Sequence, residues 1–494
     1  MDELSTNLFY ILPEIIIVLT AIVIIFIDLM FKDKRYLPQV STLGILGAIF
    51  LACYLWVSGN TGYSFGGILI TDKFSIFLKL LVLLSTLIVI LGTMDYVGRL
   101  KRFQGEYYTL ILFAAFGMML LTSAVELITI FVILEIQTFS FIALTALEKK
   151  NRSFEAAIKY LLLSAIATCV MLYGMAMFFG FTGTTFLIDM STVLSGTIQD
   201  PSNGSNLVII TASIFILSGF IFKIAGFPFH SWVPDVYEGA PTPVTGYLSV
   251  ASKAVGVGIL MRVFYVTFES SLGLNWIEWP TILSGLSVLS MFFGNLVAIK
   301  QTKLKRMLAY SSIAHAGYIF LALTYLSDNE MNLFSGTSVL FYLTGYAFTN
   351  LLAFMVITIV SNSDQNENIN SIDGLYKRSP FLAGCMALSL ISLTGLPPTG
   401  LFFGKIYIFY GAVESGYWWL ALLGVLNSFI SAYYYLRPIR FIYSDGKAAS
   451  NILEKRTHVY SKIALMISVL GILILGLLPF WLFGFAESAV ISLI

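Results

Sequence analysis

Long apolar runs alternate with short polar segments along the chain, and the runs have the length of membrane-spanning helices. A helix needs roughly 20 mostly apolar residues to cross the hydrocarbon layer. Fourteen runs of about this length cover residues 10–31, 39–58, 73–94, 106–124, 126–146, 158–181, 207–230, 242–267, 276–300, 305–325, 335–360, 380–413, 415–436 and 459–482. The pattern predicts an all-α polytopic membrane protein with about 14 transmembrane helices.

The lysines and arginines between these runs predict the orientation of the chain. When each loop is numbered by the helix before it, the odd-numbered loops carry 20 of the 28 basic residues. The even-numbered loops and both ends carry none. Because basic loops stay on the cytoplasmic side, both termini are expected on the outer side of a bacterial or archaeal plasma or inner membrane.

Composition narrows the function classes. The chain is 58% hydrophobic and 11% charged, with a formal net charge of +1, whereas soluble domains are about a quarter charged. It has no basic stripe that would meet phosphates, which argues against a nucleic-acid partner. Cys53, Cys169 and Cys385 are too far apart in sequence for a metal-binding or iron–sulfur motif. We therefore expect no metal or redox cofactor on this chain.

Four charged residues fall deep inside predicted spans: Glu135, Lys223, Lys253 and Lys405. A charge at the centre of a bilayer costs about 2.5–3.5 kcal/mol on translocon scales, so such residues mark ion paths or pair with one another. Static ion pairs with isolated structural lysines are the alternative. Three deep lysines outnumber one deep glutamate, however, so they cannot all be neutralised as pairs.

Lysine and glutamate suit proton transfer. An apolar environment weakens the hold of a lysine on its proton, and a neighbouring carboxylate strengthens it. A lysine with a movable acidic partner can therefore bind and release a proton in turn. If Glu135 pairs with Lys223, separating the two would release the Lys223 proton, which is a hypothesis about geometry.

Two predicted spans are interrupted beside a buried lysine. Proline removes a backbone donor and glycine loosens the turn; the residues concerned are Gly226 and Pro228 in helix seven and Gly395, Pro397, Pro398 and Gly400 in helix twelve. Broken helices in corresponding positions of two halves point to a transport site. A packing kink without function is the alternative for a single proline.

The offset between the two breaks predicts the domain organisation. Helices seven and twelve differ by five, and an odd offset gives the two helices opposite directions, as inverted repeats require. We therefore divide the chain into helices 1–3 (1–105), a first repeat of helices 4–8 (106–267), a second, inverted repeat of helices 9–13 (276–436), and a cytoplasmic loop with helix 14 (437–494).

Two histidines are candidates for the same path. His315 lies mid-span on helix ten among hydroxyl residues and could relay protons between the halves; a buried neutral histidine bonded to a hydroxyl is the alternative. His230, at the end of the broken helix seven, is a candidate for an access route. Tyr and Trp residues are interpreted as interfacial belts and core packing.

The segments that carry this chemistry resemble a known family. The stretch from Phe227 to Val244, the Ser252-Lys253-Ala254 triplet and residues 305–313 are similar to the antiporter-like membrane subunits of respiratory complex I, which are related to multi-subunit cation/proton antiporters. The resemblance covers the whole chain. Two features indicate which of the antiporter-like subunits this chain resembles most. One is Leu12-Pro13-Glu14 at the start of helix one, and the other is Lys405, where a different subunit of the group has a glutamate.

This resemblance implies functions for individual residues. Glu135 and Lys223 match the family's helix-five glutamate and helix-seven lysine, Lys253 the central relay lysine, and Lys405 the terminal lysine of the outlet half. His315 matches a histidine on the same axis. In the family, such subunits move protons when neighbouring subunits reduce quinone, so flavin, iron–sulfur clusters and quinone are expected on partner subunits of the membrane arm and beyond.

Two other functions remain open from the sequence. The chain could be a subunit of a stand-alone sodium/proton antiporter without a redox partner, or a membrane scaffold that no longer transports ions. No role can be assigned to Lys79 or Glu126, for which packing or surface contact is the default. Arg262, near the end of helix eight, is expected to reach the lipid headgroups.

Overall fold

A computed structural model describes residues 3–31, 34–98, 103–197, 205–269, 279–326, 331–364, 368–444 and 459–493. The first part of the chain forms α1 (Glu3–Tyr10), α2 (Leu12–Met30), η1 (Lys34–Tyr36), α3 (Leu37–Ser58), β1 (Gly62–Ser64), β2 (Leu69–Thr71) and α4 (Lys73–Val97). The strands β1 and β2 pair as a small antiparallel hairpin.

The middle part is helical throughout. It forms α5 (Gln104–Ser123), α6 (Leu127–Ala146), α7 (Asn151–Thr182), α8 (Leu187–Thr197), α9 (Ser205–Ile224), α10 (Trp232–Gly239), α11 (Thr242–Tyr247), η2 (Leu248–Ser252), α12 (Lys253–Val263) and η3 (Phe264–Glu269). The η2 and η3 segments are π-helical, so α11, η2, α12 and η3 follow one another without leaving the helix.

The last part completes the bundle. It forms α13 (Trp279–Ile299), α14 (Leu304–Leu323), α15 (Asn332–Asp364), η4 (Ile369–Ile372), α16 (Leu375–Arg378), α17 (Pro380–Thr394), α18 (Gly400–Glu414), α19 (Trp418–Ile442), α20 (Val459–Leu477) and α21 (Pro479–Ile491). Most of the loop that opens the predicted C-terminal segment 437–494 lies outside the described residues.

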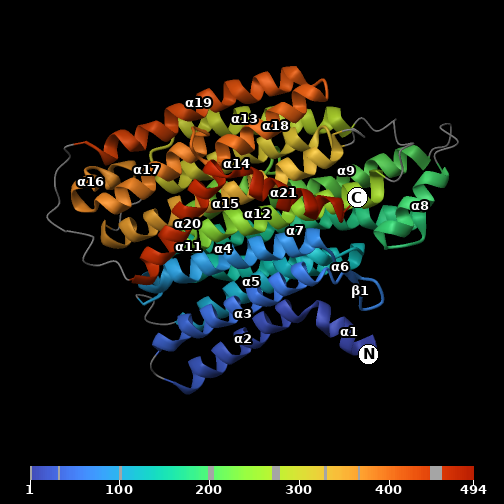
Figure 1. Ribbon diagram of the computed structural model, residues 1–494, viewed down its shortest axis with the longest axis horizontal. Helices are drawn as coiled ribbons and strands as arrows, with labels where there is room; N and C mark the ends of the chain where they lie inside the picture. Colours follow the sequence, from blue (N-terminus) through green and yellow to red (C-terminus); the bar gives the residue numbers. More distant parts are fainter. Residues whose placement is uncertain are drawn as a thin grey trace.

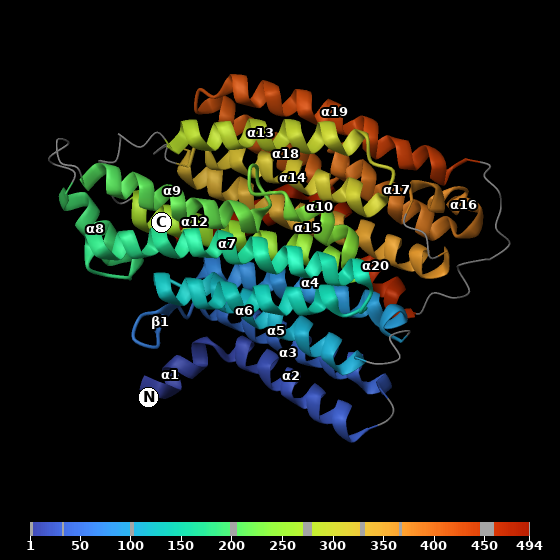
Figure 2. The same cartoon turned by 180° about the vertical axis from the view of Figure 1, so that it is seen from behind.

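The helices lie side by side in roughly one direction. Figure 1 shows the N-terminal helices α2 and α3 at one edge and α19 at the other, with α20 and α21 returning to lie against α15 and α4 in the middle. Both termini lie at the end of the bundle that carries α8 and β1, whereas α16 lies at the opposite end, and the reverse view agrees (Figure 2). The predicted all-α membrane architecture is confirmed.

Twelve helical stretches of the described chain are long and apolar enough to cross a membrane. Of the two remaining predicted spans, helix ten corresponds to α14, and helix twelve is divided into α17 and α18. The count of fourteen and the inverted repeats stay predictions. Beyond the predicted helix fourteen, α21 adds a further short apolar helix that the sequence interpretation did not include.

The chain leaves the helix at both of the expected breaks. Helix α9 ends at Ile224 and α10 begins at Trp232, and α17 ends at Thr394 before α18 begins at Gly400. The π-helical segment η2 directly precedes Lys253 and was not expected from the sequence. Single π turns inside α-helices are frequent at functional sites, so all three buried lysines lie beside irregular helix.

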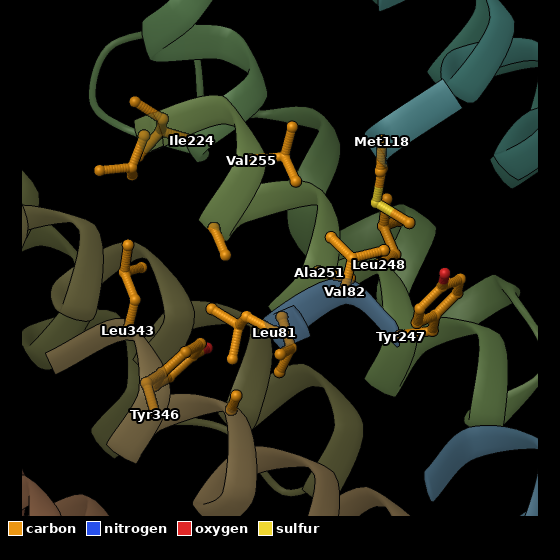
Figure 3. Close-up of a cluster of buried hydrophobic side chains, with 14 of the residues drawn as sticks. Leu81, Val82, Met118, Ile224, Tyr247, Leu248, Ala251, Val255, Leu343 and Tyr346 are labelled. Atoms are coloured by element: carbon orange, nitrogen blue, oxygen red, sulfur yellow. The ribbon is translucent and has the colours of Figure 1, made fainter. Parts of the chain in front are cut away.

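Apolar side chains fill the space where the two halves meet. Figure 3 shows part of this core, in which Leu81 and Val82 of α4, Ile224 at the end of α9 and Val255 of α12 lie close to Leu343 of α15. The four helices are therefore packed around an apolar interior, and the polar side chains described below are embedded in it.

Candidate functional site

The deep basic residues predicted from the sequence are all inside the protein. Lys223, Lys253 and Lys405 are 4%, 2% and 5% exposed, and His315 is 1% exposed. Glu135 on α6 is half-buried. The three ammonium groups therefore have no access to lipid headgroups, and the partners that the protein offers them decide whether they are held as fixed ions.

Lys223 does not form an ion pair with Glu135 among the described residues. Its ammonium donates a hydrogen bond to the hydroxyl of Thr138, which follows Glu135 by one helical turn on α6. The Oε1 atom of Glu135 is buried and has no hydrogen-bond partner in the described structure. The Glu135 carboxylate thus forms no ion pair with Lys223, and the Thr138 hydroxyl accepts the hydrogen bond of the ammonium instead.

The break after Lys223 is closed by protein groups. The amide of Gly226 donates to the carbonyl of Ile221 over 2.9 Å, and the amide of Phe227 donates to Ser290 Oγ over 3.0 Å. Trp232 Nε1 donates to the carbonyl of Phe222 over 3.2 Å. A Cβ on Gly226 would lie 2.5 Å from the ring of Phe320, so this turn packs too tightly for a side chain.

Lys253 is held by neutral oxygens. Its Nζ lies 2.7 Å from Ser312 Oγ and also donates to the carbonyl oxygen of Ser312. The same ammonium lies 5.7 Å from the ring centre of Tyr346. No carboxylate of the described residues pairs with it, so its charge is stabilised only by the hydroxyl and carbonyl of Ser312 and by the ring of Tyr346.

His315 lies at the centre of a group of tyrosines. Its Nδ1 is 2.5 Å from the hydroxyl of Tyr342 and its Nε2 is 3.1 Å from the hydroxyl of Tyr435, which also contacts Ser311. The ring of Tyr346 lies 4.9 Å away. The sequence interpretation assigned the tyrosines to packing and membrane belts; here they come from α15 and α19 and surround the predicted relay histidine.

Lys405 fills the break in the twelfth span. Its Nζ donates to the carbonyl oxygens of Thr394 at 2.8 Å and Leu393 at 3.4 Å, and it lies 4.8 Å from the ring centre of Tyr318. Gly395 has φ +85°, and a Cβ there would lie 2.8 Å from the Lys405 side chain. Glycine is needed at this position for both conformation and space.

Between Lys223 and Lys253 the interior is apolar. The helices α9 and α12 are in contact, and a Cβ on Gly256, one turn past Lys253, would lie 3.5 Å from Lys223 Cβ. No hydrogen bond of the described residues joins the two lysine groups, and side chains such as Ile224 and Val255 pack here (Figure 3). The polar row thus has two parts, one at Lys223 and one from Lys253 to Lys405.

His230 has apolar surroundings. Its ring stacks on Phe227 at 5.3 Å and lies 4.3 Å from the ring of Phe293, and the side chain is 9% exposed. The role of His230 in an access route stays a prediction.

Two buried ion pairs were missed by sequence reasoning. Lys79 Nζ lies 2.7 Å from Glu14 Oε1, and both side chains are fully buried between α2 and α4. Arg262 binds Asp72 through two hydrogen bonds of 2.8 and 3.0 Å. The expectation that Arg262 reaches the headgroups is wrong, because a bidentate carboxylate inside the protein offers it stronger hydrogen bonds.

The two residues without an assigned role now have contacts. Glu126 accepts hydrogen bonds of 2.6 Å from the amide and hydroxyl of Thr129 and so caps the first turn of α6. This contact is a helix cap, which is neither of the default contacts expected from the sequence. Lys79, in contrast, is a buried charge with a partner that is distant in sequence.

A cluster of charges lies at the start of α14 and beside α10. Arg306 binds Asp235 at 3.0 Å and Glu238 at 2.7 Å. Lys159 pairs with Asp235 at 2.9 Å, and Lys303 pairs with Glu238 at 2.5 Å. This cluster ties α10, which follows the first break, to the helix that carries His315.

The described residues contain no group of three or more His, Cys, Asp or Glu side chains placed to hold a metal ion. What the site offers is a set of ammonium groups, an imidazole and hydroxyls. Hydroxyl groups can donate and accept hydrogen bonds at once, and a histidine ring has two nitrogens of opposite role. This arrangement is suited to passing protons.

Comparison with known proteins identifies the family. Residues 124–431 match the family model described as "NADH:quinone oxidoreductase/Mrp antiporter, TM". Among curated relatives, NADH-quinone oxidoreductase subunit N of Trichlorobacter lovleyi is 39% identical over 98% of this chain and 97% of its own length. Subunit N of Dehalococcoides mccartyi is also 39% identical, over 97% and 98%.

Solved structures of related membrane complexes have a similar fold. A chain of respiratory complex I from Thermus thermophilus is 30% identical, covers 96% of this chain and 98% of its own, and superposes with a TM-score of 0.79. A chain of an archaeal membrane-bound sulfane sulfur reductase, 24% identical over 99% and 98%, has a TM-score of 0.85 and shares the fold. The chain therefore belongs to the membrane-subunit family common to NADH:quinone oxidoreductases and Mrp antiporters, and the two curated relatives named above are called subunit N.

Proposed function

We propose that the chain is a proton-translocating membrane-arm subunit of a complex-I-type NAD(P)H:quinone oxidoreductase in a bacterial membrane. The observation that carries this proposal is the buried row from Lys253 through Ser312, His315 and its tyrosines to Lys405. Curated relatives that share nearly the full length are subunits of NADH-quinone oxidoreductases. Flavin, iron–sulfur clusters and quinone then belong to partner subunits.

The neutral partners of the lysines support proton exchange. A lysine locked against a buried carboxylate is difficult to deprotonate, because that leaves an unpaired buried anion. Lys223, Lys253 and Lys405 instead donate to a hydroxyl or to carbonyl oxygens. Each can lose its proton without stranding a charge. Between Lys253 and Lys405, proton movement proceeds through Ser312, His315 and the tyrosine hydroxyls.

The two parts of the row suggest where the path is controlled. No hydrogen bond of the described residues joins Lys223 to Lys253, and their neighbours along the chain, Ile224 and Ala254, belong to the apolar core. Protons therefore cross there only when water enters or the side chains move. Glu135 lies one turn from the Thr138 hydroxyl that holds Lys223. We infer that Lys223 alternates between Thr138 and Glu135, and that pairing with Glu135 holds the proton while release to Thr138 frees it.

The energy required is modest. Moving one charge against 100 mV takes ~2.3 kcal/mol. A hydrogen bond to a charged group contributes about 1.5–3 kcal/mol. Exchanging one partner of a single lysine therefore supplies energy of the required order, and no large domain motion is needed within this chain.

The same proposal includes the orientation of the chain in the membrane and its division into two repeats. The basic loops would face the cytoplasm and both termini the outer side, and both termini lie at one end of the bundle (Figure 1). Residues 106–267 and 276–436 would form the two inverted repeats around the row. Other antiporter-like subunits and small quinone-side subunits of the membrane arm would be the partners.

The deciding experiment uses the assembled complex in vesicles. Lys223→Ala should strongly reduce proton uptake while electron transfer from donor to quinone continues, because the chain carries no redox step. Normal proton stoichiometry in the assembled variant would refute the proposal and favour a scaffold. A stand-alone antiporter is distinguished by purifying the chain with its partners: quinone-site and iron–sulfur subunits must accompany it.

A further inference from the structure

An apolar cavity of about 270 Å³ lies between α4, α15, α20 and α21. Its lining includes Phe77, Leu81 and Leu84 of α4, Phe348 of α15 and Ile474 of α20. The lining hydroxyl of Thr344 is already bonded to the carbonyl of Leu340 over 2.9 Å. Apart from the Trp481 indole, the other lining side chains are apolar, so the cavity fits a hydrocarbon chain.

The cavity runs along one face of α4. Phe77, Leu81 and Leu84 are spaced by four and three residues and so lie above one another on the helix. At 1.5 Å per residue this face extends over roughly 10 Å along the helix axis. Since α4 is one of the predicted spans, the cavity follows the direction of lipid acyl chains.

A lysine lies at the end of this face, one turn before Phe77. Lys73 is half-exposed, and its Nζ lies 5.8 Å from the ring centre of Trp56. Trp56 in turn stacks at 3.9 Å on Phe485, which lines the cavity. Within the described chain Lys73 has no acidic partner, because the adjacent Asp72 is bound to Arg262. The mouth of the cavity thus carries an unmatched positive charge.

Aromatic side chains lie at two levels of the cavity. Trp56, near the end of α3 (Leu37–Ser58), lies beside Lys73, whereas Trp481 lines the cavity at the start of α21 and is 80% exposed. Aromatic residues concentrate at the level of the headgroups, and basic residues there attract anionic lipids. Lys73 begins α4 at the end of the bundle that carries β1. Lys73, the ring of Trp56 and the apolar cavity therefore follow one another in the same order as the headgroup, the interfacial region and the acyl chain of a phospholipid.

We propose that this cavity binds one acyl chain of an anionic phospholipid and that Lys73 binds its phosphate. A quinone would bring an apolar tail but no anion to meet Lys73, and a free phosphate would leave the hydrocarbon depth empty. The site lies against α15, the helix that carries Tyr342 and Tyr346. A bound lipid there would pack against the helix that supports the His315 group. The inference does not depend on the proposed function.

The first test measures lipid that stays with the purified complex. Complexes containing wild-type chain, Ile474→Trp or Lys73→Gln are washed with detergent, and bound lipids are quantified by mass spectrometry. Ile474 lines the cavity and is 44% exposed, so tryptophan there should fill the space without disturbing the core. We expect Ile474→Trp to lose one phospholipid per complex and Lys73→Gln to lose the preference for anionic lipid.

The matched control is Lys462→Gln, since Lys462 is a half-exposed lysine near the other end of α20. It should keep both the lipid and the preference. Equal lipid content in Ile474→Trp and wild type would overturn the proposal. So would an equal loss of anionic lipid in both lysine variants, because that would show a non-specific effect of charge.

A second test reports on the site directly. Complexes are reconstituted in phosphatidylcholine vesicles to which phosphatidylglycerol with brominated acyl chains is added, and quenching of Trp481 is taken as the signal lost in Trp481→Phe. Quenching by brominated phosphatidylglycerol should exceed that by brominated phosphatidylcholine several-fold, and Lys73→Gln should remove the difference. Added inorganic phosphate should not compete. Equal quenching by both lipids, or full competition by phosphate, would contradict the assignment.

Discussion

The ammonium group of Lys405 donates a 2.8 Å hydrogen bond to the carbonyl oxygen of Thr394, the last residue of α17. A helix end leaves its last four carbonyls without partners. At this end, the amides of Gly395 and Leu396 bond the carbonyls of Ile391 and Ser392. Lys405 takes the remaining two. The break and the lysine are therefore one unit, since the ammonium both occupies the row and closes the helix.

This double role leads to the first prediction. Lys405→Gln keeps a side-chain donor for one carbonyl but cannot exchange protons, so the complex should assemble while proton uptake is lost. Lys405→Ala also leaves two buried carbonyls unbonded, at a cost of about 1–3 kcal/mol each, and should lower the thermal stability of the complex. Proton uptake in vesicles and thermal unfolding measure the two effects separately. Retained pumping in Lys405→Gln would show that the path bypasses this residue.

The hydroxyls around His315 give the second prediction. Tyr435→Phe removes the hydroxyl that lies 3.1 Å from His315 Nε2 and also contacts Ser311. A neutral hydrogen bond contributes about 0.5–1.5 kcal/mol, so the proton translocation rate should fall roughly two- to tenfold. Tyr325→Phe is the control, because the Tyr325 hydroxyl bonds the carbonyl of Ile408 and contacts neither His315 nor Ser311 among the described residues. An equal effect of both substitutions would indicate a general loss of packing.

Local features of the sequence predicted the framework of this site. The helix-length apolar runs indicated the spans, and the prolines and glycines after Lys223 and before Lys405 indicated the breaks. Spans and breaks depend only on residues that are close together in the sequence. The deep positions of Lys223, Lys253, Lys405 and His315 could be predicted as well, because the depth of a residue in the membrane can be counted from the ends of its predicted helix.

The partners of these residues could not be predicted from local pattern. Thr138 rather than Glu135 holds Lys223, and three tyrosines from two other helices, α15 and α19, surround His315. Such contacts depend on helix rotation and on which helices are neighbours, neither of which is encoded in a single run. The ion pair of Arg262 with Asp72 was missed for this reason, because the two residues are 190 positions apart.

The charge cluster at α10 gives a prediction for pH. Partial burial would raise the pKa of Asp235, but hydrogen bonds from Lys159 and Arg306 outweigh it and hold the pKa below its ordinary value. A lowered pKa in the folded state means that Asp235 stabilises the protein above its ordinary pKa of about 3.9. This contribution is lost as the pH falls toward the lowered value.

Asp235→Asn should therefore reduce the thermal stability of the complex at neutral pH. The difference from wild type should shrink when the pH is lowered through the window below about pH 4. Thermal unfolding monitored across this range is the measurement. A difference between wild type and variant that stays constant over the whole range would show that the carboxylate is not the group that titrates.

The pair Glu14–Lys79 permits a test that separates structure from transport. Lys79→Met leaves the Glu14 carboxylate buried and alone, which costs about 3–5 kcal/mol, so the complex should assemble poorly. Adding Glu14→Leu replaces the pair by apolar side chains of similar volume. Such a replacement is often neutral or stabilising, so the double variant should regain assembly. Among the described residues the pair forms no hydrogen bond or ion pair with Lys223, Lys253 or Lys405, so the double variant should also pump protons normally. Assembly and proton uptake of the single and double variants are compared in the same vesicles. A double variant that assembles but does not pump would place Glu14 and Lys79 in the proton path, and the transport chemistry would then extend to the N-terminal helices.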